Sequence, residues 1–557
     1  MTARCASATN LVAPGTASVI PAHKDAGTHL CETTRSCLTS ARPDDRSGKG
    51  RGTPSRAAFD VGATRKHRGH GTRAMVWQAP RGQGSDKVES PPPHDWLTPP
   101  EGPAPLTPTL VWGGPTDVVS LYEGPLRLHR AGHVSLPRQG SVRLLLRSGT
   151  SVVWDVDLEG VEYEESRIWQ NRGEASDLRL SFEAHPQVAT RVPVFLTGDG
   201  QGIVQGLPPG ESSPTATAVR AVTFCLPSLF GAEVVVQRHA DGSWASWSGR
   251  RTFEMVGWEV TLEAREGLEQ LLSQATRERL FVGTHVVQIR RIDGGSFSGS
   301  AADQMLTGLT FGLSFALGRW VGLIHAQGFS AKGEPLWTQW GAPLAETPGR
   351  GSTRWWNENR PEDLITFLQA WLTRWLHAED RQPLSFLVTS ALAAGERAFV
   401  EQRLLTIMAA LDHYWWAFAG KRGVRLGPKL YQQDGEATRK IRGLLQATGI
   451  PQALQENGEL LEYAREHSLL DTAQTLTYIR NRLTHPKATE QLYERHGLVA
   501  NASRLARRYL DLVLLWELGY QGHACDGTIL NRWSGESDPV PWIREDTEEQ
   551  DPPRVGE

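Results

Sequence analysis

The chain has 557 residues, of which 39% are hydrophobic and 22% are charged, and its formal net charge is −3. This length is enough for about two to four domains. The near-neutral charge excludes a polycation that coats nucleic acid, so any nucleic-acid site must be a local basic patch. The five cysteines form no C-x-x-C pair, which argues against a zinc site or a disulfide framework and is typical of the reducing cytoplasm.

Residues 1–105 are rich in Gly, Pro, Ser, Thr, Arg and His and show no apolar period, as in "ESPPPHDWLTPPEGPAPLTP". Such a composition cannot bury enough apolar surface to offset the entropy of the chain. We therefore expect a disordered extension, and one without a secretory signal because its start has no continuous apolar core. An alternative is that translation begins at Met75, where "MVWQAP" opens the first stretch that contains tryptophan.

Residues 106–345 change to a period of two. The stretch "SVRLLLRSGTSVVWDVDLEG" predicts two strands around a Ser-Gly turn, and "AEVVVQRHADGSWASWSG" predicts a hairpin with an Asp-Gly turn. Helical patterns are interleaved in "REGLEQLLSQATRERL" and "SAADQMLTGLTFGLSFALG". We expect one β-rich α+β domain with a sandwich-like sheet arrangement, a barrel being the alternative.

The most apolar stretch, residues 305–318, is too short to span a membrane and is followed directly by Arg319. Its Gly308 and Gly312 form a G-x-x-x-G pattern, which also occurs in membrane helix dimers. We expect a buried helix and no membrane association.

The chain becomes helical from Pro361 onward. We expect residues 346–382 to form a linking helix and residues 383–522 an all-α bundle. One of its helices carries an apolar stripe with steps of three and four residues, formed by Leu404, Ile407, Met408, Leu411, Trp415 and Phe418. The last segment, residues 523–557, contains "REDTEEQDPP" and is predicted to be an acidic disordered tail.

One helix of this bundle ends in the sequence "YIRNRLTHP". Asp471 followed by Gln474 resembles a capping box, which sets the start of the helix, and Pro486 places His485 at its C-terminal end. On an ideal helix Asn481 lies about 40° from His485 and Arg480 about 140° from it. Asn481 can therefore hold the imidazole, and the longer Arg480 side chain can reach round the helix end.

The Arg-x4-His spacing by itself is uninformative, because chance alone produces about one such pair in a chain of this composition. A second pair, Arg65 and His70, lies in the low-complexity extension. The pair Arg480 and His485 differs from it in context, since Asn481 follows the arginine, the helix is capped, and a proline closes it.

The stretch "DTAQTLTYIRNRLTHP" resembles the signature helix of HEPN domains, and the subfamily it is most similar to is the Apea-like HEPN group. In that group an upstream helix carries an acidic residue, and Asp412 in "AALDHYWW" stands where the family often has Glu. The resemblance covers residues 383–520, and such proteins often carry a β-rich N-terminal domain. It implies a metal-independent endoribonuclease of prokaryotic antiviral or abortive-infection defence, in which the β-rich domain is a possible sensor.

The resemblance implies Arg480 and His485 as catalytic residues, with Asn481 and Asp412 in support and no metal or other cofactor. In this reaction the RNA 2′-OH attacks the adjacent phosphate, histidine transfers protons, and arginine stabilises the phosphate. One histidine cannot accept and donate a proton at once, so we expect a homodimer, or a dimer of dimers, that pairs two such helices. Arg482 and Lys487 are weaker candidates for contacts with RNA, with tRNA as a possible substrate, and the expected location is the cytoplasm.

Three alternatives remain open at this point. Arg480 can simply pair with an acid across the bundle, and His485 can merely interact with the helix C-terminus. The bundle can be a non-catalytic HEPN module that binds RNA or protein. The many tryptophans can be core residues, stacking platforms for bases, or a carbohydrate-binding surface on the β-rich domain.

Overall fold

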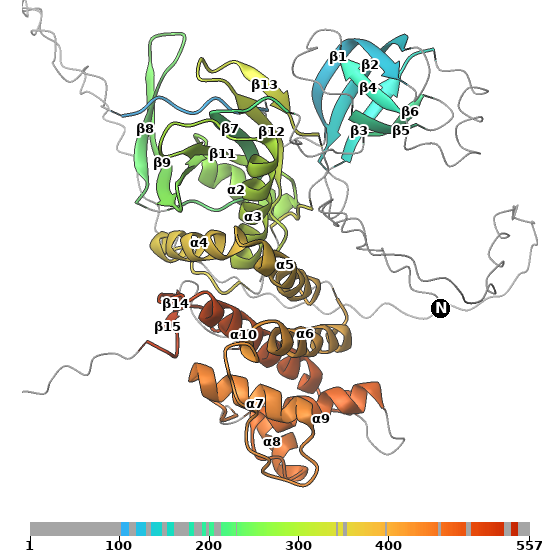
Figure 1. Ribbon diagram of the computed structural model, residues 1–557, viewed down its shortest axis with the longest axis vertical. Helices are drawn as coiled ribbons and strands as arrows, with labels where there is room; N and C mark the ends of the chain where they lie inside the picture. The colour runs from blue at the N-terminus through green and yellow to red at the C-terminus, as the bar shows by residue number, and fades with distance from the viewer. Residues whose placement is uncertain are drawn as a thin grey trace, which may run out of the picture. The chain divides into compact units, whose positions relative to one another are not determined.

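The structure is a computed structural model. It describes residues 102–110, 118–129, 135–146, 153–160, 178–182, 192–196, 200–204, 213–229, 231–340, 344–348, 354–395, 398–454, 458–485, 492–528 and 536–543. Within these residues a β-rich part precedes a helical part, as the α+β expectation requires (Figure 1). Across the same residues, no helix combines the length and the apolar character needed to cross a membrane.

The first six strands form a closed antiparallel barrel with the order β1-β2-β3-β6-β5-β4. The strands are β1 Val118–His129, β2 Leu136–Leu145, β3 Val153–Leu158, β4 Arg179–Phe182, β5 Val192–Leu196 and β6 Gln201–Val204. Alternate residues of β3 point inward, so that Trp154, Val156 and Leu158 are buried. The period of two in this stretch therefore arises from one face that fills the barrel and one that does not.

The remaining long strands form a seven-stranded antiparallel sheet with the order β13-β12-β7-β11-β10-β9-β8. They are β7 Ala218–Phe224, β8 Glu233–Arg238, β9 Trp244–Met255, β10 Trp258–Ala264, β11 Gly283–Arg291, β12 Leu323–Phe329 and β13 Pro335–Thr338. The expected hairpin is confirmed, because β8 pairs with β9 and Gly242 in the turn has φ 86°, a conformation that favours glycine.

The sandwich-like arrangement expected for this region is replaced by the barrel and the seven-stranded sheet. The pairing that closes the barrel joins β1 to β4, with Leu126 opposite Phe182 and His129 opposite Arg179. Strand periodicity reports which residues of a strand are buried, and it carries no information about which distant strand becomes the neighbour.

Two helices interrupt the strands of the second sheet along the chain. They are α2 Leu268–Glu278, after β10, and α3 Gly299–Leu317, after β11. The interior of α3 is almost wholly buried, which confirms the expected buried helix. A Cβ atom at Gly308 would lie 2.6 Å from Trp375 Cδ1, and one at Gly312 would lie 2.8 Å from Trp371 Cδ1. The two glycines of the G-x-x-x-G pattern therefore leave room for two indole rings of α4 to pack against α3.

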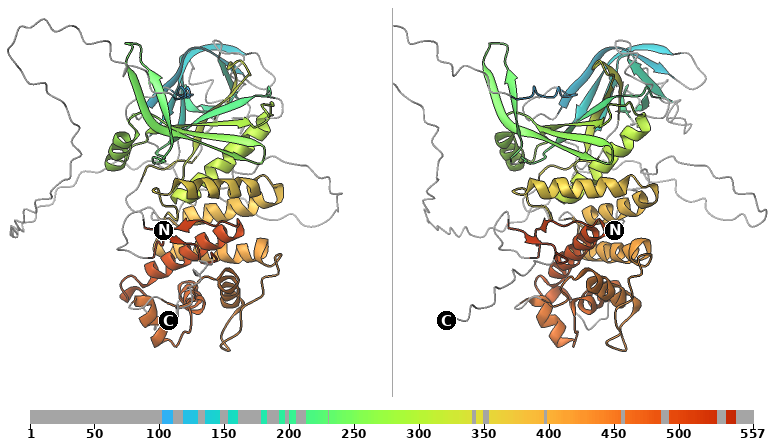
Figure 2. Two further views of the ribbon diagram at one scale, coloured as in Figure 1. Left: turned by 90° about the vertical axis from the view of Figure 1, so that its left-hand side faces the viewer. Right: turned by 60° about the vertical axis from the view of Figure 1, so that its left-hand side comes forward.

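The helical part follows as a series of helices. These are α4 Pro361–Trp375, α5 Ala378–Ala393, α6 Val400–Tyr414, the π-helical turn η3 Trp415–Ala419, α7 Glu436–Thr448, α8 Glu459–Glu466, α9 Thr472–Thr484, the 3-10 turn η4 Leu492–Glu494 and α10 Leu498–Glu517. Helices α6 and α10 lie side by side in all views (Figures 1 and 2). Residues 536–543 add the strand β15 Asp538–Pro539, which pairs with β14 His523–Ala524.

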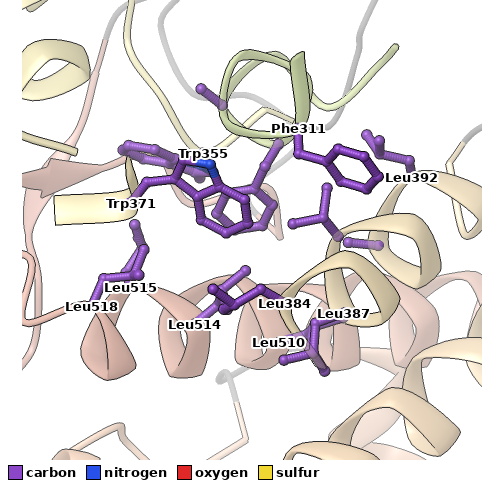
Figure 3. Close-up of a cluster of buried hydrophobic side chains, with 14 of the residues drawn as sticks. Phe311, Trp355, Trp371, Leu384, Leu387, Leu392, Leu510, Leu514, Leu515 and Leu518 are labelled. Carbon is purple, nitrogen blue, oxygen red and sulfur yellow. The ribbon is translucent and has the colours of Figure 1, made fainter. Parts of the chain in front are cut away.

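One hydrophobic core runs from α3 through the C-terminal helices (Figure 3). Phe311 of α3 and Trp371 of α4 lie above three leucines in Figure 3. These are Leu384 and Leu387 of α5 and Leu514 of α10. Because these side chains share one cluster, the second sheet with α3 and the helices after it are packed as a continuous unit.

The expected linking segment 346–382 contains α4 and the start of α5. Helix α4 is a core helix, since Phe367, Trp371 and Leu372 are completely buried. The expected bundle boundary at residue 383 falls inside α5, where Pro383 lies within the helix. The composition of a segment does not reveal whether a helix between two regions is packed against both.

Parts of the two expected disordered segments are ordered. The Pro103 carbonyl accepts a hydrogen bond from Val236 N–H at 3.2 Å, and the Ala104 carbonyl accepts one from Arg250 Nη2 at 2.7 Å. At the other end, the Trp542 indole N–H donates to the Tyr520 carbonyl at 2.7 Å. Residues 1–101 and 544–557, and with them Met75, lie outside the described residues.

Candidate functional site

Helix α9 begins where its capping residues predict. Asp471 is the N-cap, and its Oδ1 accepts a hydrogen bond from Gln474 N–H at 2.8 Å. The Gln474 side chain reaches back to accept from Leu470 N–H at 2.8 Å. Leu476 and Ile479 are completely buried. The caps and this apolar stripe fix which face of α9 is turned to the solvent.

The C-terminal end of α9 presents the candidate catalytic residues. His485 is the C-cap, and its backbone N–H donates to the Asn481 carbonyl at 2.8 Å. His485 and Asn481 are exposed, and Arg480 is half-buried. Arg480 Nη1 donates to Asn481 Oδ1 at 3.0 Å. The Asn481 amide oxygen therefore holds the guanidinium group, where we had expected the amide to hold the imidazole.

Among the described residues, no acid pairs with either proposed catalytic side chain. In the part of the chain that the structure describes, the Arg480 side chain forms only the hydrogen bond to Asn481, and the His485 imidazole forms none. The reading of Arg480 as one half of an ion pair across the bundle is therefore not supported. A cation and an imidazole remain open to solvent at one helix end, which is a requirement for contact with a phosphodiester.

Of the two weaker candidates for RNA contacts, the structure describes Arg482 and does not describe Lys487. Arg482 Nη2 donates to the Tyr478 hydroxyl at 2.5 Å, and its guanidinium lies 4.8 Å from the centre of the Tyr478 ring. Tyr478 packs in turn against His467. Arg482 is thus turned along its own helix toward an aromatic cluster. Lys487 lies outside the described residues.

Asp412, expected as a supporting acid, has a structural partner. Its Oδ1 accepts from Lys440 Nζ at 2.8 Å, and Lys440 also pairs with Glu436 at 3.0 Å. Helix α6, which carries Asp412, packs against α9, but no contact of the described residues joins Asp412 to His485. The pair ties α6 to α7 and gives Asp412 a role in packing.

Arg442 of α7 is a residue that sequence reasoning missed. Its side chain is 1% exposed, and its Nη1 donates to Asp434 Oδ2 at 3.0 Å. Its Nε donates to Asp471, the cap of α9. The sequence gives a weak signal for it, an arginine directly after Ile441 in an apolar stretch, and that signal does not name the two acids.

Four of the seven tryptophans that the structure describes in the β-rich region are core residues. Trp154, Trp258, Trp337 and Trp340 are buried, whereas Trp244 is 44% exposed. A carbohydrate-binding surface needs several exposed rings, so this alternative loses its support. In the helical part Trp416 is 64% exposed.

Two segments match models of known protein families. Residues 213–351 match the YopA central domain, and residues 379–538 match the YopA C-terminal domain. Both segments match YopA domains. A relative, the SPbeta prophage-derived uncharacterized protein YopA of Bacillus subtilis (strain 168), is 22% identical over 306 residues, which cover 54% of this chain and 67% of the relative. No solved structure matches the chain.

The two YopA matches cover separate parts of the fold. The barrel, β1 to β6, precedes both matches, and α4 lies between them. The central match contains the seven-stranded sheet with α2 and α3, and the C-terminal match contains α9 with the candidate site. The matched models are those of YopA domains, and the HEPN resemblance rests on the residues of α9 and α6.

Proposed function

We propose that the protein is a metal-independent endoribonuclease of the HEPN type whose catalytic residues are Arg480 and His485. The observation that supports the proposal is the exposed C-terminal end of α9, where a guanidinium and an imidazole lie within five residues and neither is neutralised by an acid of the described chain. Asn481 supports this arrangement because its amide oxygen orients the Arg480 side chain.

The proposed reaction requires a proton acceptor, a proton donor and a cation. A base removes the proton of the RNA 2′-OH, and the 2′-oxygen then attacks the adjacent phosphorus. The bond from phosphorus to the 5′-oxygen breaks, an acid protonates that oxygen, and the products carry a 2′,3′-cyclic phosphate and a 5′-hydroxyl. His485 suits the proton transfers because an imidazole can both accept and donate a proton. Arg480 suits the phosphorane because its fork binds two oxygens and stays charged.

The active species in this proposal is a homodimer or a dimer of dimers. Each chain supplies one α9 and therefore one His485, whereas the reaction needs an acid and a base at the same phosphate. Pairing two copies about a two-fold axis doubles both His485 and Arg480 in one cleft. The relative is named as a prophage-derived protein, which is consistent with a role in conflict between phage and host. We place the proposed activity in the cytoplasm, in such defence.

A second candidate function is a non-catalytic HEPN module that binds RNA or protein. The half-buried Arg480 held by Asn481 serves binding as well as catalysis. His485 separates the two functions, because a surface that only binds does not need a proton-transfer group at the helix end.

Cleavage of labelled RNA tests the proposal. The full chain, with EDTA present, is expected to cut single-stranded RNA or tRNA and to leave cyclic phosphate ends. His485→Ala and Arg480→Ala are each expected to lower the rate by about 10²-fold or more. Two matched controls are expected to keep the rate, His496→Ala at an exposed histidine and Asp412→Asn at the partner of Lys440. Equal cleavage by wild type and His485→Ala would overturn the proposal, and RNA binding without any cleavage would favour the second candidate.

A further inference from the structure

We infer that residues 421–430, called the basic strap below, form with Trp416 a binding surface for single-stranded RNA. The strap connects η3 to α7 and has the sequence "KRGVRLGPKL". The inference rests on the proposed function only in taking RNA as the polymer, and it concerns a surface distinct from the Arg480 and His485 pair.

The backbone of the strap is fixed on α7. Gly427 N–H donates to the Arg439 carbonyl at 2.8 Å, and Arg439 Nε donates to the Gly427 carbonyl at 3.1 Å. A Cβ atom at Gly443 would lie 2.3 Å from the Arg425 carbonyl oxygen, so the chain can approach α7 this closely only because residue 443 is glycine. The strap is therefore held before any ligand arrives, which lowers the entropy cost of binding.

The end of the strap is closed by one buried carboxylate. Asp434 Oδ2 accepts from Leu430 N–H at 2.9 Å and from Tyr431 N–H at 3.2 Å. Val424 N–H, near the start, donates to the Ala419 carbonyl at 3.0 Å. With both ends and the middle tied down, the backbone of the strap has a defined path along α7.

Three cations of the strap have no acidic partner in the part of the chain that the structure describes. Lys421, Arg425 and Lys429 are exposed, and none forms an ion pair or a side-chain hydrogen bond among the residues that the structure describes. Arg422 is different, because it pairs with Glu517 at 2.9 Å. Lys421 lies in the turn that follows η3, and Arg425 and Lys429 lie in the irregular segment after it. Spaced four residues apart, the three cations form separate points, which suits successive phosphates better than a single anion.

Trp416 and the basic strap both contact α7. Trp416 is 64% exposed and sits in the π-helical turn η3, and such turns are frequent at functional sites. Lys440 Nζ lies 4.5 Å from the centre of its ring. Lys440 follows Arg439 directly, and Arg439 is the residue that binds the strap. Trp416 and the middle of the strap therefore flank the same turn of α7.

The combination of an exposed indole and spaced cations favours a single-stranded nucleic acid over an acidic protein. A base stacks on an aromatic ring while its phosphates meet the cations, and stacking tolerates any sequence. An acidic peptide would use the cations and leave the indole unused. A duplex would present phosphates but keep its bases stacked inside.

Binding can be measured without cleavage by using the full chain with His485→Ala and a fluorescein-labelled 15-nucleotide single-stranded RNA. Replacing Lys421, Arg425 and Lys429 together by Gln is expected to reduce the slope of log K against log salt by about 2, because each phosphate contact on a single strand contributes about 0.7. Trp416→Ala is expected to weaken binding about fivefold to a hundredfold at every salt concentration and to leave the slope unchanged.

The matched control compares two variants that each remove one positive charge. Arg425→Gln is expected to weaken binding, and Lys332→Gln, at an exposed lysine in the turn before β13, is expected to leave it unchanged. An unchanged slope in the triple variant overturns the inference. So does tighter binding of duplex RNA, or competition by polyglutamate combined with no effect of Trp416→Ala. The proposed nuclease is judged separately by the cleavage assay: it fails if the wild-type chain binds RNA and does not cut it, or if wild type and His485→Ala cut equally.

Discussion

Arg442 donates a hydrogen bond from Nε to Asp471 Oδ2 at 2.6 Å. Asp471 uses its other oxygen to cap α9, and Arg442 also binds Asp434, the carboxylate that closes the basic strap. One arginine that is 1% exposed thus connects the helix of the candidate catalytic residues to the candidate RNA-binding surface. A planar fork is suited to this task, because it can bind two carboxylates in fixed directions.

Replacing Arg442 is expected to lower the free energy of unfolding severely. Arg442→Ala leaves Asp434 and Asp471 without their common cation, and breaking such a buried pair typically lowers the free energy of unfolding by about 3–5 kcal/mol. Arg442→Lys is also expected to destabilise, because an ammonium cannot reproduce the fork. The measurement is urea unfolding followed by circular dichroism.

The matched control for this experiment is Arg290→Ala. Arg290 is 51% exposed and pairs with Glu259 on the sheet, so its loss is expected to change the unfolding free energy by no more than about 1 kcal/mol. Similar losses for Arg442→Ala and Arg290→Ala would contradict a special role for the buried arginine.

Gly308→Ala is expected to destabilise the protein although alanine is the better helix former. The gain in helix propensity is about 1 kcal/mol. The added Cβ would lie 2.6 Å from Trp375 Cδ1 and 2.9 Å from Leu372 Cδ2, and overpacking of this kind typically costs about 1–3 kcal/mol. Thermal unfolding should therefore show a lower Tm for Gly308→Ala. Gly527→Ala, where a Cβ would meet no atom within 4 Å, should leave the Tm nearly unchanged.

Stability is expected to fall as the pH drops below about 6.5, with His285 as one cause. Burial lowers the pKa of His285 from 6.5 to about 3, and neither ring nitrogen has a hydrogen-bond partner in the described structure. Between these two pH values the unfolded chain binds a proton that the folded chain does not. The contribution is fully present above pH 6.5 and is lost at about 1.4 kcal/mol per pH unit as the pH falls toward 3.

The test compares unfolding free energies at pH 7, 6 and 5 for wild type and His285→Leu. The leucine variant should lose less stability per pH unit than wild type. Val287→Ala, on the same strand and completely buried, should lower stability at every pH and keep the slope of wild type. Equal slopes for wild type and His285→Leu would show that this histidine is not the titrating group.

Local features of the fold could be derived from the sequence. The cap at Asp471, the end of α9 at His485 and the hairpin turn at Gly242 all appear where the pattern places them. Each depends on residues close together in the chain, where hydrogen bonds and backbone preferences act directly. The same holds for the buried helix that contains Gly308.

The sequence alone therefore determined single local features, such as the start of α9, the hairpin turn and the buried α3, and it placed Arg480 and His485 at one helix end. The tertiary structure decided that β1 closes on β4, that α4 belongs to the core, that Asp412 pairs with Lys440, and that Arg442 holds α9. These contacts join residues far apart in the chain. Their partners are selected by packing, burial and charge in three dimensions, and no period or spacing records that selection.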